Sequence, residues 1–252
     1  MYNNCILENY TYILGATSEI GKELIKLKLD RYNRNLCLLT TNPSKLETYV
    51  EELGMARSSK IKVVDYNLSN SDQTVAKLLK LREDFPPRRI FVMVGYLGNR
   101  NGDNSDEEIS KIFNVNVNYL CKIFDSLYEA DYFEDIESIH FSSSVGADLF
   151  YKRLFDYYES KRLLNEYLQS LRTKTSNVFI QTMKIGPVFD TEMGPSTGIF
   201  KLVASSKSAI AKNIIKGING DEEEYIPKIW KLIINLYKLT PNFIQEKLKK
   251  II

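Results

Sequence analysis

The sequence predicts a single α/β domain with a doubly wound parallel sheet, which is a sheet covered by helices on both faces. Short apolar runs alternate with stretches of helical periodicity along most of the chain, and parallel strands need such crossovers. A glycine-rich segment, residues 15–21, joins the first apolar run to the first helical pattern. The 252 residues, of which 44% are hydrophobic, suffice for one buried core.

The expected elements follow in order from these patterns. We expect strands over residues 10–14, 36–40, 61–66, 90–94, 136–141 and 178–185, and helices over 19–31 and 43–53. No linker or repeat divides the chain, so residues 1–252 are expected to form one domain. From residue 187 onward, glycines and prolines predict a loop-rich substrate lid to about residue 225, followed by a C-terminal helical segment to residue 252.

Composition argues against several classes of function. The net charge is +2 with acidic and basic residues interspersed, so the positive field that favours nucleic-acid binding is lacking. The three cysteines stand far apart without metal-ligand spacing, and the single histidine is His140. We therefore expect free thiols and no metal site, with His140 inside a strand. The chain has no signal-peptide pattern and no long apolar run, which predicts a cytoplasmic protein.

The turn after the first strand has the composition of a dinucleotide site. Glycines allow a tight turn and a close approach of the backbone to a diphosphate at the start of the next helix. The candidate cofactor contacts in this turn are Gly15, Thr17, Ser18, Glu19, Ile20 and Gly21. Glu19 takes the place of the usual middle glycine, so its carboxylate must point away from a phosphate. An ordinary strand-to-helix turn is the alternative interpretation.

A second set of residues can move a proton. Tyr157 and Lys161 are four residues apart in a helical pattern, so their side chains share one face. The Lys161 ammonium would lower the pKa of the Tyr157 phenol from about 10, and the phenol could then act near neutral pH. Ser144 lies thirteen residues before Tyr157 at the end of a strand-like run, with Ser143 as an alternative. The neighbouring Tyr158 would point about 100° around the helix, away from Lys161. The alternative without function is that Tyr157 is a surface tyrosine beside a solvated lysine.

Over nearly its full length the chain resembles the short-chain dehydrogenase/reductase family, whose members have a Rossmann fold. The family's glycine-rich turn, central asparagine, serine and Tyr-x-x-x-Lys helix have counterparts in residues 15–21, Asn116, Ser144, Tyr157 and Lys161. The resemblance implies that Tyr157 donates a proton to a carbonyl oxygen that the serine also hydrogen-bonds. It also implies that Lys161 binds the nicotinamide ribose. Asn116, with Asn114 and Asn118 as competing amides, would hold a water on the proton path.

The stretch after the fourth strand departs from the family pattern and bears on the substrate. Residues 93–98 read Met-Val-Gly-Tyr-Leu-Gly where many relatives have Asn-Ala-Gly. Val94 and Gly95 still offer backbone to a cofactor. Family members that act on sugars in surface-polysaccharide pathways often look similar here, which implies a keto-sugar substrate carried on a lipid or a nucleotide.

The end of the second strand bears on the choice of cofactor. Residues 39–45 read Leu-Thr-Thr-Asn-Pro-Ser-Lys, without the acid that would bind the 2′-hydroxyl of NAD. Thr41 and Asn42, with Lys45, can accommodate a 2′-phosphate, which favours NADP over NAD. By resemblance, the remaining cofactor contacts are Asn67 and Leu68 at the adenine, and Val188 and Thr191 at the nicotinamide.

The C-terminal residues 226–252 combine aliphatic side chains, Trp230 and lysines. Such a helix suits peripheral contact with an anionic membrane, and a helix packed on the core or on a second subunit explains the same composition. Relatives commonly pair through the helices that carry Asn116 and Tyr157, which implies a homodimer or homotetramer.

Together these patterns predict an NADPH-dependent enzyme that reduces a ketone on a carbohydrate. A nucleotide-sugar epimerase or dehydratase would use the same tyrosine and lysine, but the roughly sixty residues after Val188 are few for its substrate domain. A non-catalytic dinucleotide-binding protein would account for Glu19 and the missing Asn-Ala-Gly asparagine, although all four catalytic positions are filled.

Overall fold

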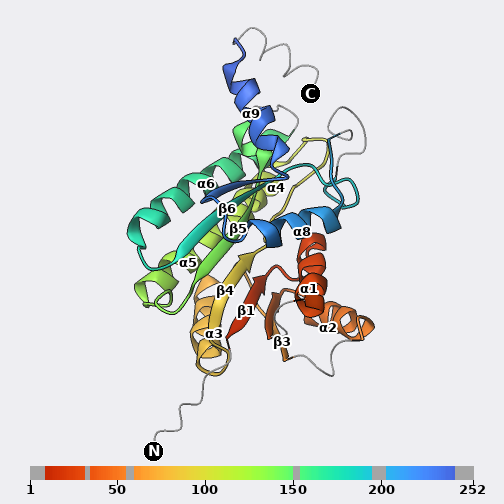
Figure 1. Ribbon diagram of the computed structural model, residues 1–252. Helices are drawn as coiled ribbons and strands as arrows, with labels where there is room; N and C mark the ends of the chain where they lie inside the picture. The colour runs from red at the N-terminus through yellow and green to blue at the C-terminus, as the bar shows by residue number, and fades with distance from the viewer. Residues whose placement is uncertain (1–8, 32–34, 55–59, 150–153, 195–202, 242–252) are drawn as a thin grey trace, which may run out of the picture.

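The computed structural model describes residues 9–31, 35–54, 60–149, 154–194 and 203–241 (Figure 1). Seven parallel strands form one sheet in the order β3-β2-β1-β4-β5-β6-β7. The strands are β1 (Tyr10–Leu14), β2 (Leu36–Thr40), β3 (Ile61–Asp65), β4 (Pro87–Val92), β5 (Ser138–Ser144), β6 (Phe179–Ile185) and β7 (Glu223–Ile226). The α-helices are α1 (Glu19–Arg31), α2 (Pro43–Glu52), α3 (Ser71–Asp84), α4 (Asp106–Phe113), α5 (Tyr119–Glu129), α6 (Phe155–Lys174), α8 (Lys207–Gly217) and α9 (Ile229–Leu239). A π-helix, η1 (Asn114–Asn118), joins α4 to α5, and a 3₁₀-helix, η2 (Val145–Asp148), follows β5.

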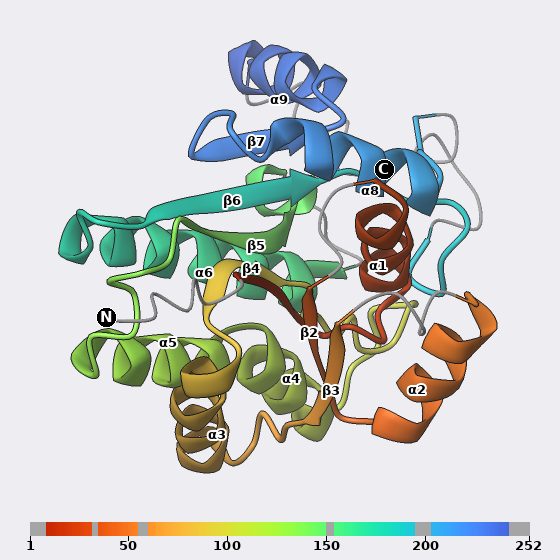
Figure 2. The same ribbon diagram turned by 60° about the horizontal axis from the view of Figure 1, so that its bottom comes forward.

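Helices cover both faces of the sheet, as Figure 2 shows for α1 and α8 on one side and α5 and α6 on the other. Side chains alternate along each strand. In β1, Tyr12 and Leu14 belong to the hydrophobic cluster beneath α3, α5 and α6, whereas Ile13 belongs to the cluster beneath α1, α2 and α8. The doubly wound parallel sheet predicted from the sequence is therefore confirmed.

Four of the helices begin with a polar side chain at the N-cap position. Asn42, Asn70, Ser105 and Ser206 each accept a hydrogen bond from a backbone N–H in the first turn of α2, α3, α4 and α8, respectively. Such caps satisfy N–H groups that have no partner within the helix. Pro43 opens α2, where its missing N–H costs nothing.

The strand order reverses between β1 and β4, which are neighbours in the sheet although they are far apart in sequence. The connections from these two strands leave in opposite directions, so a crevice forms outside their carboxyl ends. Ligands of open α/β sheets bind in such a crevice. The turn at residues 15–18 follows β1 and residues 93–98 follow β4, so both predicted cofactor stretches lie at this edge.

The region expected to be a loop-rich lid contains regular structure. Helix α8 packs beside α1, and β7 extends the sheet by pairing with β6 from Thr182↔Glu223 to Ile185↔Ile226. The prediction of loops up to residue 225 is wrong for these two elements. The reason is that β7 is short and begins with acidic residues, which resemble a solvated turn when their ion-pair partners are not known. Residues 242–252 of the predicted C-terminal segment lie outside the described residues.

Helix α9 has one buried and one exposed apolar face. Trp230 is 1% exposed and covers Gly186, where an added Cβ would lie 2.2 Å from Trp230 Nε1. Trp230 is therefore a core residue, and it is not free to insert into a membrane interface as the sequence suggested. The opposite face exposes four large aliphatic side chains, which are Ile229, Leu232, Leu236 and Leu239. Within the described ranges no helix is long and apolar enough to cross a bilayer.

His140 is fully buried inside β5, as expected, and its ring is held in place by neighbouring side chains. Its Nδ1 lies 2.8 Å from Gln181 Oε1, its Nε2 lies 2.9 Å from Ser138 Oγ, and its ring stacks on Phe91. Burial lowers the pKa of His140 to about 4, and the nearby positive charge of Arg89 adds to the effect, against the hydrogen bond to Gln181. The imidazole is thus a neutral structural group.

The buried imidazole predicts a stability that depends on pH. Because the pKa of His140 is about 4 in the fold and about 6.5 in the unfolded chain, its contribution is complete above pH 6.5 and is lost as the pH falls to 4. The loss amounts to roughly 3 kcal/mol of unfolding free energy. Chemical denaturation at several pH values should be compared between the wild type and His140→Gln. The carboxylates titrate in both proteins, so the difference between the two curves gives the contribution of His140. Parallel pH curves for the two proteins would contradict the assignment.

Candidate active site

The glycine turn is shaped by contact with the end of β4. Gly15 has φ +75°, and an added Cβ would lie 2.7 Å from the carbonyl oxygen of Met93. Ser18 Oγ accepts a hydrogen bond from Gly21 N at 3.0 Å, which closes the turn onto the start of α1. The turn therefore lies directly against the end of β4, beside the positive end of α1. This arrangement fits a diphosphate, which binds backbone N–H groups at helix N-termini.

Other residues of the turn point elsewhere. Ile20 packs against the cluster beneath α1, α2 and α8. The Glu19 carboxylate accepts a hydrogen bond from Glu192 N at 2.7 Å and lies 3.8 Å from Lys207 Nζ. It is thus directed to the segment after β6 and to α8, which meets the condition that it should turn away from a phosphate. Thr191, predicted at the nicotinamide, lies in the same segment and donates to the Val188 carbonyl oxygen at 3.1 Å.

Thr40, which sequence reasoning did not select, joins the turn to the end of β2. Its buried hydroxyl lies 3.1 Å from Thr17 Oγ1 and accepts a hydrogen bond from Asn42 N at 3.0 Å. The Asn42 side chain caps α2 through Lys45 N, while Thr41 is exposed. The side chains of Thr41 and Lys45 are thus both exposed to an incoming ligand at this edge. A threonine at the last position of a strand was the available signal for Thr40.

The residues predicted at the adenine are partly engaged within the protein. Asn67 Oδ1 accepts hydrogen bonds from both the backbone N–H and the hydroxyl of Ser69, so this amide stabilises its own turn. Leu68 packs against the cluster beneath α3, α5 and α6. A ligand would therefore contact the main chain of these two residues, or the atoms of their side chains that are not engaged within the protein.

Lys161 is the most constrained charged group of the site. It is 2% exposed, and its ammonium donates to the carbonyl oxygens of Val94 at 3.2 Å and Ser142 at 3.1 Å. An added Cβ at Gly95 would lie 3.5 Å from Lys161 Nζ, an ordinary contact distance, so Gly95 lies next to the ammonium. The Lys161 Nζ lies 6.0 Å from the centroid of the Tyr157 ring. The helix thus brings the predicted pair together at the carboxyl ends of β4 and β5.

The pKa values of this pair differ from the prediction. Burial raises the pKa of Tyr157 to about 12 and lowers that of Lys161 to about 8. The predicted lowering of the phenol pKa is therefore wrong for the fold alone. The physical reason is that desolvation disfavours the charged form of each group, and the ammonium bonds main-chain carbonyls instead of the phenol. A neutral phenol is nevertheless the form that donates a proton.

Asn116 is completely buried within the π-helix η1. Its Oδ1 accepts from Tyr96 N at 2.7 Å, and its Nδ2 donates to Tyr96 O and to Ser160 Oγ, both at 2.9 Å. The side chain thus shapes the backbone after β4, and its amide is already satisfied. Of the competing asparagines, Asn118 donates to Asn114 Oδ1 and both are away from these contacts.

Ser160 was also missed, although it directly precedes Lys161. Its hydroxyl donates to the Tyr157 carbonyl oxygen at 2.7 Å and accepts from Asn116, so it connects α6 to η1. A small polar residue on the buried face of a helix, next to a candidate lysine, was the only signal in the sequence.

The three serines at the end of β5 have different partners. Ser142 Oγ lies 3.5 Å from the Val94 carbonyl oxygen, and Ser143 donates to Asn165 Oδ1 at 2.6 Å. Ser144 Oγ accepts from Gly146 N at 3.1 Å. That contact uses a lone pair of the Ser144 hydroxyl and leaves its proton available to an incoming oxygen. Tyr158 packs on this turn, since an added Cβ at Gly146 would lie 2.0 Å from its ring.

Among the described residues, no group of three or more histidine, cysteine, aspartate or glutamate side chains could hold a metal ion. The polar groups beside Lys161 and Tyr157 are instead the hydroxyls of the serines and the amide of Asn116. Such a set can hold hydroxyl groups and transfer a proton.

Comparison with known proteins identifies the family. The model of the short chain dehydrogenase family matches residues 9–199, so the chain belongs to this family of oxidoreductases. No curated protein matches the sequence. Solved structures similar to this one include a short chain dehydrogenase from Burkholderia cenocepacia in complex with NADP, with a TM-score of 0.77, 15% identity, and coverage of 96% of this chain and 98% of that chain.

Two further structures are similar in the same way. A Shigella flexneri short chain dehydrogenase complexed with NADP has a TM-score of 0.73 and 15% identity, and covers 86% of this chain and 96% of its own. An actinorhodin polyketide ketoreductase with NADPH has a TM-score of 0.71 and 14% identity, and covers 87% and 95%. At these identities the similarity is one of fold.

Two glycines allow a matched test of the turn. Gly15 and Gly54 both have positive φ, but nothing lies within 4 Å of an added Cβ at Gly54. Gly54→Ala should cost about 1 kcal/mol of unfolding free energy from backbone strain alone. Gly15→Ala should cost more, because its methyl group would meet the Met93 carbonyl, and it should weaken NADPH binding about tenfold or more. Denaturation midpoints and titration calorimetry measure the two effects; equal effects of the two substitutions would refute the proposed close packing.

Proposed function

We propose that this protein reduces a ketone to an alcohol with NADPH. The observation that carries the proposal is the Tyr157 ring, whose centroid lies 6.0 Å from the buried Lys161 ammonium at the carboxyl ends of β4 and β5. NADPH, when bound, supplies the hydride. The phenol is protonated at neutral pH, since its pKa is about 12, so it is ready to donate a proton to the carbonyl oxygen.

The other residues would support that proton transfer. The free proton of the Ser144 hydroxyl would stabilise the negative charge that develops on the carbonyl oxygen. Lys161, which donates to two carbonyl oxygens, has a third donor for ribose hydroxyls. Its charge would lower the pKa of Tyr157 as the phenol releases its proton. Asn116 fixes the backbone at Tyr96 and so would shape the floor of the pocket; a water on the proton path would be held by the main chain of η1.

The choice of NADPH over NADH is supported by two findings. Residues 39–45, which end β2 and begin α2, include no acidic residue, and Thr41 is exposed. Three solved structures with the same fold are complexes with NADP or NADPH. A 2′-phosphate would add hydrogen bonds at Thr41 and at the start of α2, so we expect NADPH to bind about tenfold more tightly than NADH. Titration of the protein with each nucleotide measures the ratio, and a preference for NADH would contradict the proposal.

The proposed substrate is a keto-sugar, carried on a lipid or a nucleotide, in the synthesis of a surface polysaccharide. The support is the resemblance of residues 93–98 to family members with that role. The ketoreductase among the similar structures acts, by its name, on a polyketide, so carbonyl groups on larger carriers are compatible with this fold. An epimerase or dehydratase would release no oxidised cofactor. Oxidation of NADPH with a panel of keto-sugars therefore separates these classes, and a non-catalytic protein would consume none.

Replacement of Tyr157 tests the assigned chemistry. Tyr157→Phe should lower kcat by about a hundredfold or more, because the proton donor is lost, while the dissociation constant of NADPH should stay within about twofold. Tyr158→Phe is the matched control, since Tyr158 packs on the serine turn, and it should retain most activity. Steady-state kinetics and calorimetry supply the two readouts. Full turnover by Tyr157→Phe would refute the role.

We also propose peripheral membrane contact through α9. The four exposed aliphatic side chains lie on one face of this helix, and α9 contains lysines but no acidic residue. Vesicles of phosphatidylglycerol should retain the protein in sedimentation, and Leu236→Asp should reduce the bound fraction about tenfold. Tyr128→Asp, at another exposed apolar residue, is the control for charge. Equal binding by both variants would exclude α9 as the contact.

Assembly as a homodimer or homotetramer is proposed through the helices that carry Asn116 and Tyr157. The family commonly pairs there, and α4, η1 and α6 are in mutual contact in this chain. Light scattering after size exclusion measures the mass, and a monomer at micromolar concentration would overturn the proposal.

A further inference from the structure

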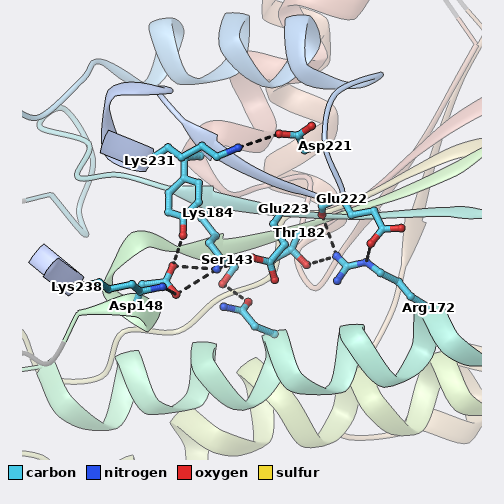
Figure 3. A network of polar contacts seen from close by, with 12 residues as sticks. Ser143, Asp148, Arg172, Thr182, Lys184, Asp221, Glu222, Glu223, Lys231 and Lys238 are labelled. Atoms are coloured by element: carbon cyan, nitrogen blue, oxygen red, sulfur yellow. Dashed lines mark hydrogen bonds and ion pairs between the residues drawn. The ribbon is translucent and has the colours of Figure 1, made fainter. Parts of the chain in front are cut away.

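A buried lysine in β6 lies beside the turn that follows Ser144. The Lys184 side chain is 5% exposed, and its Nζ lies 2.9 Å from Asp148 Oδ2 and 2.9 Å from Glu223 Oε2 (Figure 3). Asp148 is the last residue of η2, and Ser144 directly precedes this short helix. A buried ammonium is tolerated only when its partners compensate for its lost hydration. The position of Asp148 is therefore tied to that of Lys184.

Asp148 also receives contacts from β7 and α9. The Tyr225 hydroxyl donates to Asp148 Oδ2 at 2.9 Å, and Lys238 Nζ lies 3.7 Å from Oδ1. Burial by itself would lower the pKa of Lys184, but the hydrogen bonds to Glu223 and Asp148 and their negative charges outweigh it and leave the pKa above its ordinary value. Lys184 therefore stays charged, and the end of η2 is fixed by three elements at once.

The neighbouring ion pairs of residues 221–224 differ from one another in whether their cation also contacts η2. The acidic residues 221–224 each have a cationic partner, and the pairs are Asp221–Lys231, Glu222–Arg172, Glu223–Lys184 and Glu224–Lys228. Of these four cations, only Lys184 also reaches η2. Figure 3 shows Lys231 bonded to Asp221, on the far side of Lys184 from Asp148. Lys231 thus offers a control: its replacement removes an exposed ion pair of the 221–224 segment and takes away no contact with η2.

The turn determines where the Ser144 hydroxyl lies. Gly146 N donates to Ser144 Oγ, and Gly146 is held under the ring of Tyr158. The turn is fixed at its start by β5 and at its end by Asp148. If Asp148 moves, the Gly146 N–H moves with it, and the lone pair of Ser144 loses its partner. The hydroxyl would then rotate among its rotamers instead of presenting its proton to a substrate.

We propose that Lys184 and Asp148 are positioning residues that hold the hydroxyl of Ser144 in its working orientation by fixing the 145–148 turn. This inference rests on the proposed function, because it assumes that Ser144 hydrogen-bonds the reacting oxygen. Both residues act through Ser144 and its turn.

The first test measures the turn itself and does not depend on activity. Hydrogen exchange is compared in the wild type, Lys184→Met, Asp148→Asn and the control Lys231→Met, with the denaturation midpoint recorded for each. Peptides that cover residues 145–149 should exchange about tenfold faster in Lys184→Met and Asp148→Asn. The control should leave these peptides unchanged. Unchanged protection in the two folded test variants would overturn the proposal, and two substitutions guard against one that fails to fold.

The second test asks whether Asp148 acts through Ser144. NADPH oxidation is followed in single turnovers with UDP-4-keto-6-deoxyglucose and, in parallel, with the keto-sugar panel. Asp148→Asn should slow turnover about tenfold without changing NADPH affinity, whereas Ser144→Ala should slow it about a hundredfold. In the Ser144→Ala background, Asp148→Asn should have no further effect, because the group that it positions is gone. Losses that multiply would show a general structural role and would overturn the proposal.

These results separate the two proposals. Full turnover by Tyr157→Phe, or no oxidation of NADPH with any ketone, would refute the proposed function, and the exchange experiment would still decide whether the ion pair fixes the turn. Activity that depends on Tyr157 but is indifferent to Lys184 and Asp148 would overturn the positioning role alone.

Discussion

The ammonium of Lys161 is buried between two main-chain carbonyls at the carboxyl ends of β4 and β5, and the rest of the site is arranged around it. A desolvated charge of this kind must be satisfied, and its bonds to the Val94 and Ser142 carbonyl oxygens fix α6 against the sheet. The same helix turn carries Tyr157 and, through Ser160, the bond to Asn116. Lys161 thus ties α6 to the ends of β4 and β5, and its neighbour Ser160 ties the same helix to η1.

Burial has opposite effects on the two titrating groups of the site. It keeps Tyr157 protonated and makes the charge of Lys161 less stable. A phenol that retains its proton is matched to reduction, in which the tyrosine gives the proton away. Oxidation of an alcohol would need the phenolate, whose formation must be supported by charge or hydrogen bonds beyond those of the fold alone.

The elements with strong apolar patterns could be predicted from the sequence, and those that depend on distant partners could not. Strands β1 and β2 match their expected ranges because five consecutive buried residues leave a clear signal. Strand β7 was missed because its two glutamates are neutralised by cations outside the strand, Lys184 of β6 and Lys228 just before α9. Spacing placed Tyr157 and Lys161 on one helix face, but it gave no account of desolvation and so reversed the direction of the phenol pKa. The Glu19 carboxylate meets Glu192 across 173 positions, a contact that no local pattern contains.

Strand β7 is an edge strand of the sheet. The backbone groups on its outer side could pair with another chain, so the features of this strand affect self-association. An unpaired border of parallel strands is a template onto which a foreign chain can add. Here that border is four residues long, is preceded by carboxylates and is followed by Pro227, which has no N–H to offer. The ion pairs that dock this strand therefore also let it carry charge at a place where an apolar strand would invite aggregation.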